Sequence, residues 1–167
     1  EEYTETLICT NTYKCNLPDG LGAWSAGGAT INNVCYGTGK GGVQNDAFIV
    51  GAMTTCHENY NGSTWSSQTA IPSPASRSGF GAGFTTDNYI IGGGCTNSLC
   101  TRIWNGSAWA AGGNLSTDGF YASGLGAYNA ASKIGGGGNC ASFLACHENW
   151  NGSTWSNETA LGYIVAG

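Results

Sequence analysis

One spacing recurs four times in this chain: a cysteine is followed nine residues later by a tryptophan. The four pairs are Cys15 and Trp24, Cys56 and Trp65, Cys100 and Trp109, and Cys146 and Trp155. Successive tryptophans are 41, 44 and 46 residues apart. A fixed period of this length indicates a repeat architecture, in which each unit buries its apolar faces against its neighbours. The sequence therefore predicts four units of about 44 residues.

The unit boundaries follow the tryptophans, and the chain termini fall inside one unit. Three units are continuous, at 25–65, 66–109 and 110–155, and the fourth is split between 156–167 and 1–24. The sequence from Cys9 to Cys15 matches that from Cys95 to Cys100, so the N-terminal piece is interpreted as the second half of a unit. We expect residues 1–167 to form a single domain.

Each unit is predicted to contain short β-strands and no helix. Runs rich in β-branched and aromatic residues alternate with Gly, Asn and Ser clusters, and no helical period is found. Strands are expected at about 79–85 and 89–93, and in the next unit at about 119–128 and 132–136. The Asn-Gly pair before each later Trp predicts a hairpin with a type I′ turn. Four short strands per unit are typical of a propeller blade.

These units resemble the kelch-type repeat. In that pattern an apolar strand ends in Gly-Gly and is followed by a loop, an acidic residue, an aromatic residue, Asn-Gly and Trp, most clearly at 89–109 and 134–155. The resemblance implies an all-β, propeller-like fold of four kelch-like repeats, with one repeat split between the N- and C-termini. It also implies that the acid makes structural hydrogen bonds. The units depart from the pattern in their shorter length and in their cysteines.

The cysteines predict one disulfide per unit, because three close pairs stand at matching places in their units and the two cysteines left over form the fourth pair. The expected pairs are Cys9 with Cys15, Cys35 with Cys56, Cys95 with Cys100, and Cys140 with Cys146. A metal site is the weaker alternative, because zinc ligands come from paired knuckles and each pair here belongs to a different unit. Disulfides form in oxidising compartments, so the expected location is extracellular: secreted, on a cell surface or on a virion surface.

Two repeated features have two interpretations each. The four tryptophans Trp24, Trp65, Trp109 and Trp155 either pack in the repeat core or stack on sugars, and their strict repetition favours the core. Five Asn-x-Ser/Thr sequons are candidates for N-glycosylation, although Asn-Gly is also explained by turn geometry alone. These sequons begin at Asn61, Asn105, Asn114, Asn151 and Asn157.

Neither a catalytic site nor a cofactor is expected. The two histidines, His57 and His147, each precede a glutamate but lie two units apart, which favours structural or surface roles over a metal or acid–base site. With five Lys and Arg residues and a net charge of -5, the chain lacks the basic face that nucleic acid requires. No apolar run approaches the roughly 20 residues of a membrane span.

The pattern as a whole predicts a secreted, non-enzymatic surface, structural or adhesive protein. The split unit leaves strand edges that either close within one chain or join the C-terminus of one copy to the N-terminus of the next. By the second route the partners are copies of the protein itself, and the chain is a filament subunit. The alternative is a glycan-binding, lectin-like propeller with surface glycans as partners, although the differing loops at 73–77 and 114–118 weaken it.

Overall fold

The protein is an array of three antiparallel sheets of four strands each. The computed structural model describes residues 27–32, 37–51, 54–72, 79–93, 99–136 and 145–162, and no helix occurs within them. The first sheet contains β1 (Gly37–Val43), β2 (Asp46–Gly51), β3 (His57–Tyr60) and β4 (Trp65–Ser67). The second contains β5 (Phe80–Gly83), β6 (Tyr89–Gly92), β7 (Thr101–Trp104) and β8 (Trp109–Ala111). The third contains β9 (Ala122–Ala127), β10 (Ala130–Gly135), β11 (His147–Trp150) and β12 (Trp155–Asn157).

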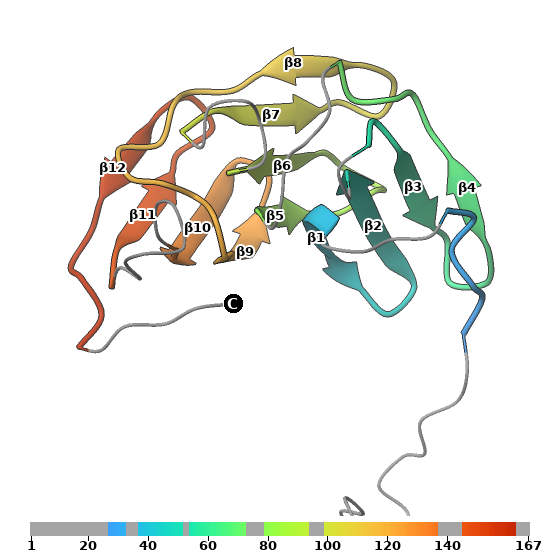
Figure 1. The fold of residues 1–167 in the computed structure, drawn as a ribbon, viewed down its shortest axis with the longest axis horizontal. Helices are drawn as coiled ribbons and strands as arrows, with labels where there is room; N and C mark the ends of the chain where they lie inside the picture. The colour runs from blue at the N-terminus through green and yellow to red at the C-terminus, as the bar shows by residue number, and fades with distance from the viewer. Residues whose placement is uncertain are drawn as a thin grey trace, which may run out of the picture.

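The three sheets stand side by side in an open arc (Figure 1). The first strands β1, β5 and β9 lie together on the inner side, and the last strands β4, β8 and β12 form the outer rim. Within each sheet the strands follow chain order. The expectation of an all-β fold with four short strands in each continuous unit is therefore confirmed. Of the predicted split unit only residues 156–162 lie in the described ranges.

Burial along the strands reflects the place of each sheet in the arc. All residues of β5 and β6 are buried, because the second sheet has a neighbour on both faces. The apolar run Tyr89-Ile90-Ile91 in β6 is the sequence signature of such a strand. In β10 of the third sheet, buried and less buried residues alternate instead, as in a strand with one covered face.

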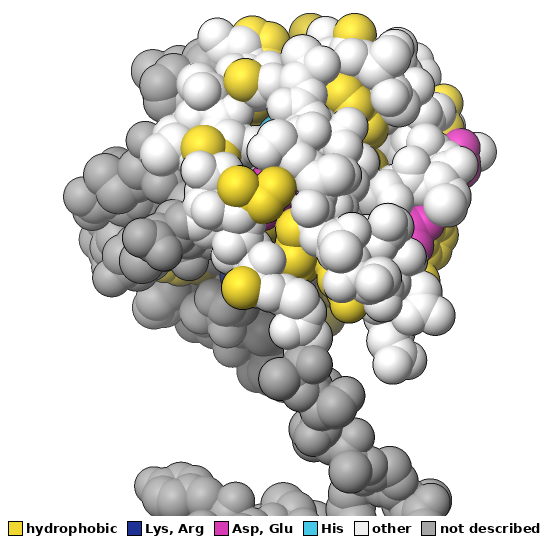
Figure 2. Space-filling view, turned by 90° about the vertical axis from the view of Figure 1, so that its right-hand side faces the viewer, with side chains coloured by type: hydrophobic (Ala, Val, Ile, Leu, Met, Phe, Trp, Pro, Cys, Tyr) yellow, Lys and Arg dark blue, Asp and Glu magenta, His cyan; other side chains and the backbone are white. Residues whose placement is uncertain are grey.

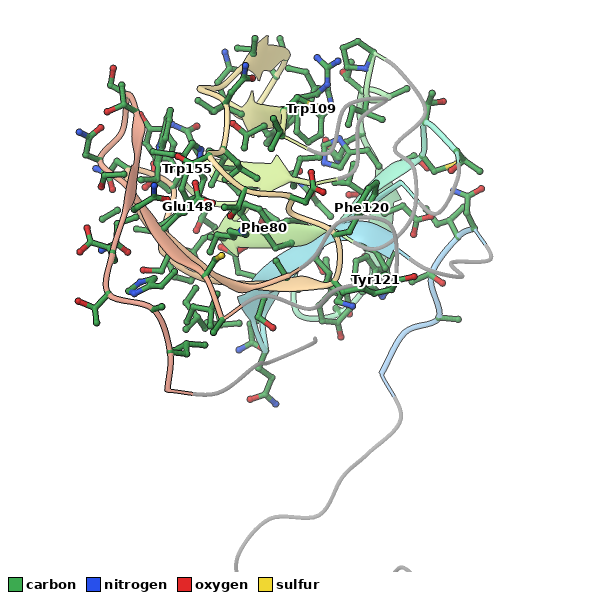
Figure 3. The ribbon with its side chains drawn as sticks, turned by 60° about the vertical axis from the view of Figure 1, so that its left-hand side comes forward. Phe80, Trp109, Phe120, Tyr121, Glu148 and Trp155 are labelled. Carbon is green, nitrogen blue, oxygen red and sulfur yellow. The ribbon has the colours of Figure 1, made fainter. Side chains whose placement is uncertain are left out.

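Two apolar clusters hold the sheets together. Between the first and second sheets, the rings of Phe48 and Tyr89 stack with centroids 3.8 Å apart, and Trp104 packs beside them. Between the second and third sheets, Phe80 meets Trp155 edge to face, with ring centroids 5.6 Å apart. Both residues are labelled in Figure 3. Each cluster thus joins two units that could not bury their faces alone.

Glycine lets the inner strands approach one another closely. A Cβ atom on Gly81 of β5 would lie 2.9 Å from the carbonyl oxygen of Lys40 in β1. A Cβ atom on Gly124 of β9 would lie 2.2 Å from the carbonyl oxygen of Gly81. Because both distances are shorter than real Cβ contacts, side chains at these two positions would push the sheets apart.

The Asn-Gly turns are where the sequence places them, but the predicted type I′ geometry is wrong. Tyr60 pairs with Trp65, so the loop has four residues, and only the glycine, Gly62, has positive φ. The Oδ1 of Asn61 instead accepts hydrogen bonds from the backbone N–H groups of Ser63 and Thr64, at 3.0 and 2.9 Å. The turn is therefore stabilised by its asparagine side chain rather than by two left-handed residues.

Candidate functional site

The third strand of each sheet places alternate side chains on the two faces of the sheet. In β3 the side chain of Glu58 faces the connector that enters the first sheet, whereas His57 faces the second sheet. The register aligns β3 with β7 and β11 residue by residue. His57 thus corresponds to Thr101 and His147, and Asn59 corresponds to Ile103 and Asn149. The contacts of a residue in one sheet can therefore be compared with those of the aligned residue in another sheet.

The two aligned glutamates hold the connectors that enter their sheets. Glu58 accepts hydrogen bonds from the backbone N–H groups of Ile31 and Asn32 at 2.9 and 2.8 Å. Glu148 accepts from the backbone N–H groups of Ser116 and Thr117 at 2.8 and 3.1 Å. Both carboxylates are buried. This is the structural hydrogen-bonding role that the kelch-like pattern implies for its acid.

Glu148 also has a buried cation as its partner. The Nζ of Lys133 lies 3.2 Å from its Oε1, and both side chains are fully buried. Burial by itself would raise the pKa of Glu148, but the hydrogen bonds from Thr117 and Ser116 and the charge of Lys133 hold that pKa below its ordinary value. No sequence pattern predicts this pair, because the residue aligned with Lys133 in the first sheet is Ile49.

The connectors between sheets follow one repeated path. The indole N–H of Trp65 donates to the carbonyl oxygen of Gly28, and that of Trp109 donates to Thr69, each at 3.0 Å. One backbone hydrogen bond repeats where the chain leaves each sheet. The N–H groups of Gln68, Gly112 and Glu158 donate to the carbonyl oxygens of His57, Thr101 and His147, respectively, at 2.9, 3.0 and 2.8 Å. A second backbone hydrogen bond repeats three residues further along. The N–H groups of Ile71, Leu115 and Leu161 donate to the carbonyl oxygens of Thr55, Leu99 and Ala145, respectively, at 3.1, 2.8 and 2.8 Å. The chain therefore leaves the third sheet as it leaves the first two, each of which is followed by another sheet.

His57 shows what this position does when a following sheet is present. Its side chain is only 2% exposed, contacts the hydroxyl of Tyr89, and lies edge to face against Trp104 at 4.6 Å. The Nδ1 lies 2.9 Å from the carbonyl oxygen of Thr69 in the connector. Burial lowers the pKa of His57, so the neutral imidazole is favoured. His57 is thus a structural residue of the contact between sheets.

His147 occupies the same position in the third sheet without such a cover. Its Nε2 lies 3.0 Å from Asn149 Oδ1, much as His57 Nε2 lies 3.1 Å from Asn59 Oδ1. Among the described residues, however, no further sheet packs on this face, and His147 is only half-buried. We call this surface the free face of the third sheet. It contains Leu125, Ser132, Ile134, His147 and Asn149.

Apolar residues on the free face confirm that it resembles a sheet-to-sheet contact. Ile134 is half-buried, whereas its counterpart Val50 in the first sheet is 1% exposed beneath the second sheet. Leu125 is 57% exposed. At the opposite end of the array, Lys40 stands where the second and third sheets have Gly81 and Gly124. The two ends therefore differ, and the third sheet keeps the residues of an interior contact.

The side of the molecule at the first sheet has a different surface. Figure 2 shows scattered hydrophobic side chains there, a few acidic ones and no continuous apolar patch. Asp46, at the turn between β1 and β2, accepts hydrogen bonds from the backbone N–H and hydroxyl of Thr86 in the second sheet. Burial would raise the pKa of Asp46, but hydrogen bonds from Thr85 and Thr86 lower it below its ordinary value.

Three of the repeated tryptophans lie on the outer strands of their sheets, and the sequon asparagines lie on the surface. Trp155 is 9% exposed, Trp65 and Trp109 are half-buried, and Trp24 lies outside the described residues. Each of these three described tryptophans begins the outer strand of its sheet. Trp104 and Trp150, which pair with Trp109 and Trp155 across their hairpins, are more deeply buried. The five sequon asparagines are all exposed: Asn61, Asn105, Asn114, Asn151 and Asn157.

The three described cysteines differ in their bonding state. Cys100 is disulfide-bonded, whereas Cys56 and Cys146 have free thiols. The expected bridges from Cys35 to Cys56 and from Cys140 to Cys146 are therefore not formed in this structure. The other five cysteines lie outside the described residues. These five are Cys9, Cys15, Cys35, Cys95 and Cys140.

Other features of the described residues offer little for catalysis. A cavity of about 180 Å³ lies between the inner strands, and it is lined by three glycines together with Lys40, Phe80, Tyr121, Ala122 and Ser123. Within the described ranges no three His, Cys, Asp or Glu residues are grouped as metal ligands would be. A search of the same ranges finds no helix of the length and apolarity that a membrane span needs.

Comparison with known proteins informs on the fold alone. No family model and no curated protein matches the chain. Among solved structures, that titled "Structure of YjhT" superposes with a TM-score of 0.60 at 14% sequence identity. The match covers 80% of this chain and 53% of that one, so this chain spans about half of its neighbour. At this identity the likeness supports a shared all-β architecture, and the kelch-type assignment stays a prediction.

Proposed function

We propose that the protein is a non-catalytic structural module of an extracellular surface assembly, and that it associates head to tail through the ends of its sheet array. One observation carries this proposal. Residues 158–162 leave the third sheet along the path that the chain takes from the first sheet to the second, yet the face that this path leads to has no cover among the described residues. The exit is that of a connector between two sheets.

The energetics favour a partner on that face. In the interior contacts, residues such as Val50 and His57 are nearly inaccessible, whereas Ile134 and Leu125 on the free face remain accessible to water. Burying apolar area contributes about 25 cal/mol per Å². A further sheet on this face would therefore bury Ile134 and Leu125, as the second sheet buries Val50. A contact between unlike ends repeats from copy to copy and yields rings or filaments.

The entering connector shows the same design at the other end of the array. Residues 27–32 are held by Glu58 and by the indole of Trp65, as connectors between sheets are held elsewhere in the chain. Elsewhere in the chain a connector held in this way follows a sheet, so a sheet should also precede residues 27–32. The connectors at both ends of the described array thus follow the path of connectors between sheets, which head-to-tail association would continue.

The glycan-binding alternative receives less support from the tryptophans. The indole N–H groups of Trp65 and Trp109 are used in hydrogen bonds to connectors, and Trp155 packs against Phe80. A sugar-stacking platform needs an accessible ring face. These three rings mostly contact other parts of the protein, which favours the structural role over glycan binding.

Light scattering on the full chain, produced in an oxidising secretory host, tests the proposal. We expect oligomers whose mass rises with protein concentration, and negative-stain microscopy should show rings or fibres. Leu125→Arg should shift the protein to monomers, because it places a charge on the free face at a site already 57% exposed. Ala110→Arg, on the exposed outer strand of the second sheet, is the matched control and should associate normally. A wild-type protein that stays monomeric at every concentration, or a Leu125→Arg variant that associates like it, would refute the proposal.

A further inference from the structure

The asparagines of the Asn-Gly turns use only one atom of their side-chain amide. In the first sheet, the Oδ1 of Asn61 accepts from the backbone N–H groups of Ser63 and Thr64. Asn105 accepts the equivalent bonds at 3.1 and 2.8 Å, and Asn151 accepts them both at 2.9 Å. Within the described ranges no hydrogen bond engages the Nδ2 of these three residues, and all three are exposed. An aspartate oxygen caps such a turn as well, so turn geometry does not explain the amide nitrogen.

A serine two residues after each asparagine is repeated although the turn does not need its hydroxyl. Ser63, Ser107 and Ser153 each donate a backbone N–H to their asparagine, a bond that any residue except proline can form. Of the three hydroxyls, only that of Ser107 bonds to its asparagine. The next position varies between threonine and alanine, whereas the serine does not vary. The turn therefore explains the asparagine oxygen and the glycine but not the serine.

Asparagine and serine are also lost together in the sequence of the fourth unit. Before its Trp24 that unit reads Asp19-Gly20-Leu21, with aspartate in place of the asparagine and leucine in place of the serine. The comparison is one of sequence only, because these residues lie outside the described ranges. Asparagine and serine separated by one residue other than proline form the acceptor sequence for N-glycosylation. A requirement for that acceptor sequence explains why the two residues occur together.

The three turns lead into strands that lie at the outer edges of their sheets. β4, β8 and β12 each pair with a neighbour on one side only, so their other side presents backbone groups without a ladder partner. Natural edge strands avoid pairing with other molecules through charges, proline or a covering group. These three strands contain neither a charge nor a proline. The residues after each tryptophan are exposed and uncharged: Ser66, Ser67, Ala110, Ala111, Ser156 and Asn157.

We propose that Asn61, Asn105 and Asn151 carry N-linked glycans, and that these glycans shield the outer edge strands from pairing with other molecules. This inference rests on the extracellular location in the proposed function. The donor is an oligosaccharide linked to a lipid diphosphate. The asparagine Nδ2 forms a bond to the anomeric carbon of the sugar, the bond from that carbon to the diphosphate oxygen breaks, and the amide loses one proton as the lipid diphosphate leaves. The Oδ1 atom keeps both of its hydrogen bonds, so the turn is preserved.

Mass spectrometry of the full chain secreted by eukaryotic cells tests the occupancy of the turns. The starting protein is Asn114→Gln/Asn157→Gln, which removes the two sequons that lie outside the turns. An amidase that releases N-glycans from the folded protein should leave aspartate at positions 61, 105 and 151. Unmodified asparagines at these positions would overturn the proposal.

The turn serines provide a matched pair of variants. Ser63→Ala/Ser107→Ala/Ser153→Ala should abolish all three glycans, and Ser63→Thr/Ser107→Thr/Ser153→Thr, which keeps the sequons, should retain them. After amidase treatment the two variants should melt at the same temperature, because the backbone N–H bonds of the turns are unchanged. A lower melting temperature for the alanine variant would mean that the serine hydroxyls have a role in the fold, which would overturn the argument from the serines.

Light scattering with Leu125→Arg added to both triple variants tests the shielding, because this change removes the proposed head-to-tail contact. The threonine variant should stay monomeric, and the alanine variant should aggregate as its concentration rises. Adding Ser66→Lys, Ala110→Lys and Ser156→Lys to the alanine variant should restore monomers, because a lysine on each edge strand opposes strand pairing. Equal scattering by the alanine and threonine variants would refute the shielding.

The outcomes separate this inference from the proposed function. If the turns carry glycans and the wild type does not associate, head-to-tail association fails and the glycan sites stand. If the wild type associates without glycans at the turns, the glycan sites fail and head-to-tail association stands.

Discussion

Lys133 and Glu148 allow a quantitative test of how the third sheet holds its connector. The change is Glu148→Gln, which leaves the ammonium group of Lys133 fully buried beside neutral oxygens only, those of Thr117 and of the new glutamine. Removing one partner of a buried ion pair costs about 3–5 kcal/mol. The matched control is Glu58→Gln. Glu58 holds its connector with a similar set of N–H donors, but the residue aligned with Lys133 is Ile49.

We therefore expect Glu58→Gln to cost only about 1–2 kcal/mol, the loss of charge from hydrogen bonds that a glutamine oxygen can still accept. Lys133→Ile reproduces the arrangement of the first sheet and should also cost about 1–2 kcal/mol, because Glu148 keeps its bonds from Ser116 and Thr117. The double variant Lys133→Ile/Glu148→Gln should cost less than Glu148→Gln alone, since no buried charge is then left without a partner.

Urea unfolding at pH 7, followed by tryptophan fluorescence, measures these free energies, and equal slopes with denaturant show that the same transition is compared. The reasoning would be refuted by equal losses for Glu148→Gln and Glu58→Gln. It would also be refuted by a double variant less stable than both single variants. Either result would mean that the connector bonds, rather than the ion pair, determine the cost.

Three further predictions concern the contacts between sheets. Gly124→Ala should destabilise the protein by more than about 2 kcal/mol in the same urea assay, because the new methyl group meets the Gly81 backbone, whereas Gly162→Ala, with open space around it, should change little. As the pH falls below 6.5, the ordinary pKa of histidine, the unfolded chain gains a proton that folded His57 takes up less readily. Stability should therefore decline through that window, and His57→Gln should flatten the decline; an unchanged pH profile would contradict the burial of a neutral imidazole. Asp46→Ala removes the acceptor of the Thr86 bonds between the first two sheets and should lower the melting temperature, and an unchanged melting temperature would show that these bonds contribute nothing.

Sequence periodicity predicted the strands well but not their turn geometry. The strands expected at about 89–93 and 132–136 appear as Tyr89–Gly92 and Ala130–Gly135, because β-branched runs bounded by glycine mark strands locally. The type I′ turn was wrong, since Asn61 forms side-chain bonds to the loop backbone and Tyr60 pairs with Trp65 rather than with Ser63. Turn type depends on how the flanking strands pair, which the Asn-Gly pair does not specify.

The sequence alone determined the repeat, its period, the all-β class and the strands of the continuous units, because each of these depends on residues close together in the chain. Only the tertiary structure decided which repeated residues act together. His57 and His147 are identical in their local sequence, yet one is buried against Tyr89 of the next sheet and the other lies on a free face. Lys133 is likewise an unremarkable strand residue until the fold buries it beside Glu148. The physical reason is that burial and hydrogen-bond partners come from the neighbouring sheet, and that neighbour is set by the order of the sheets in space.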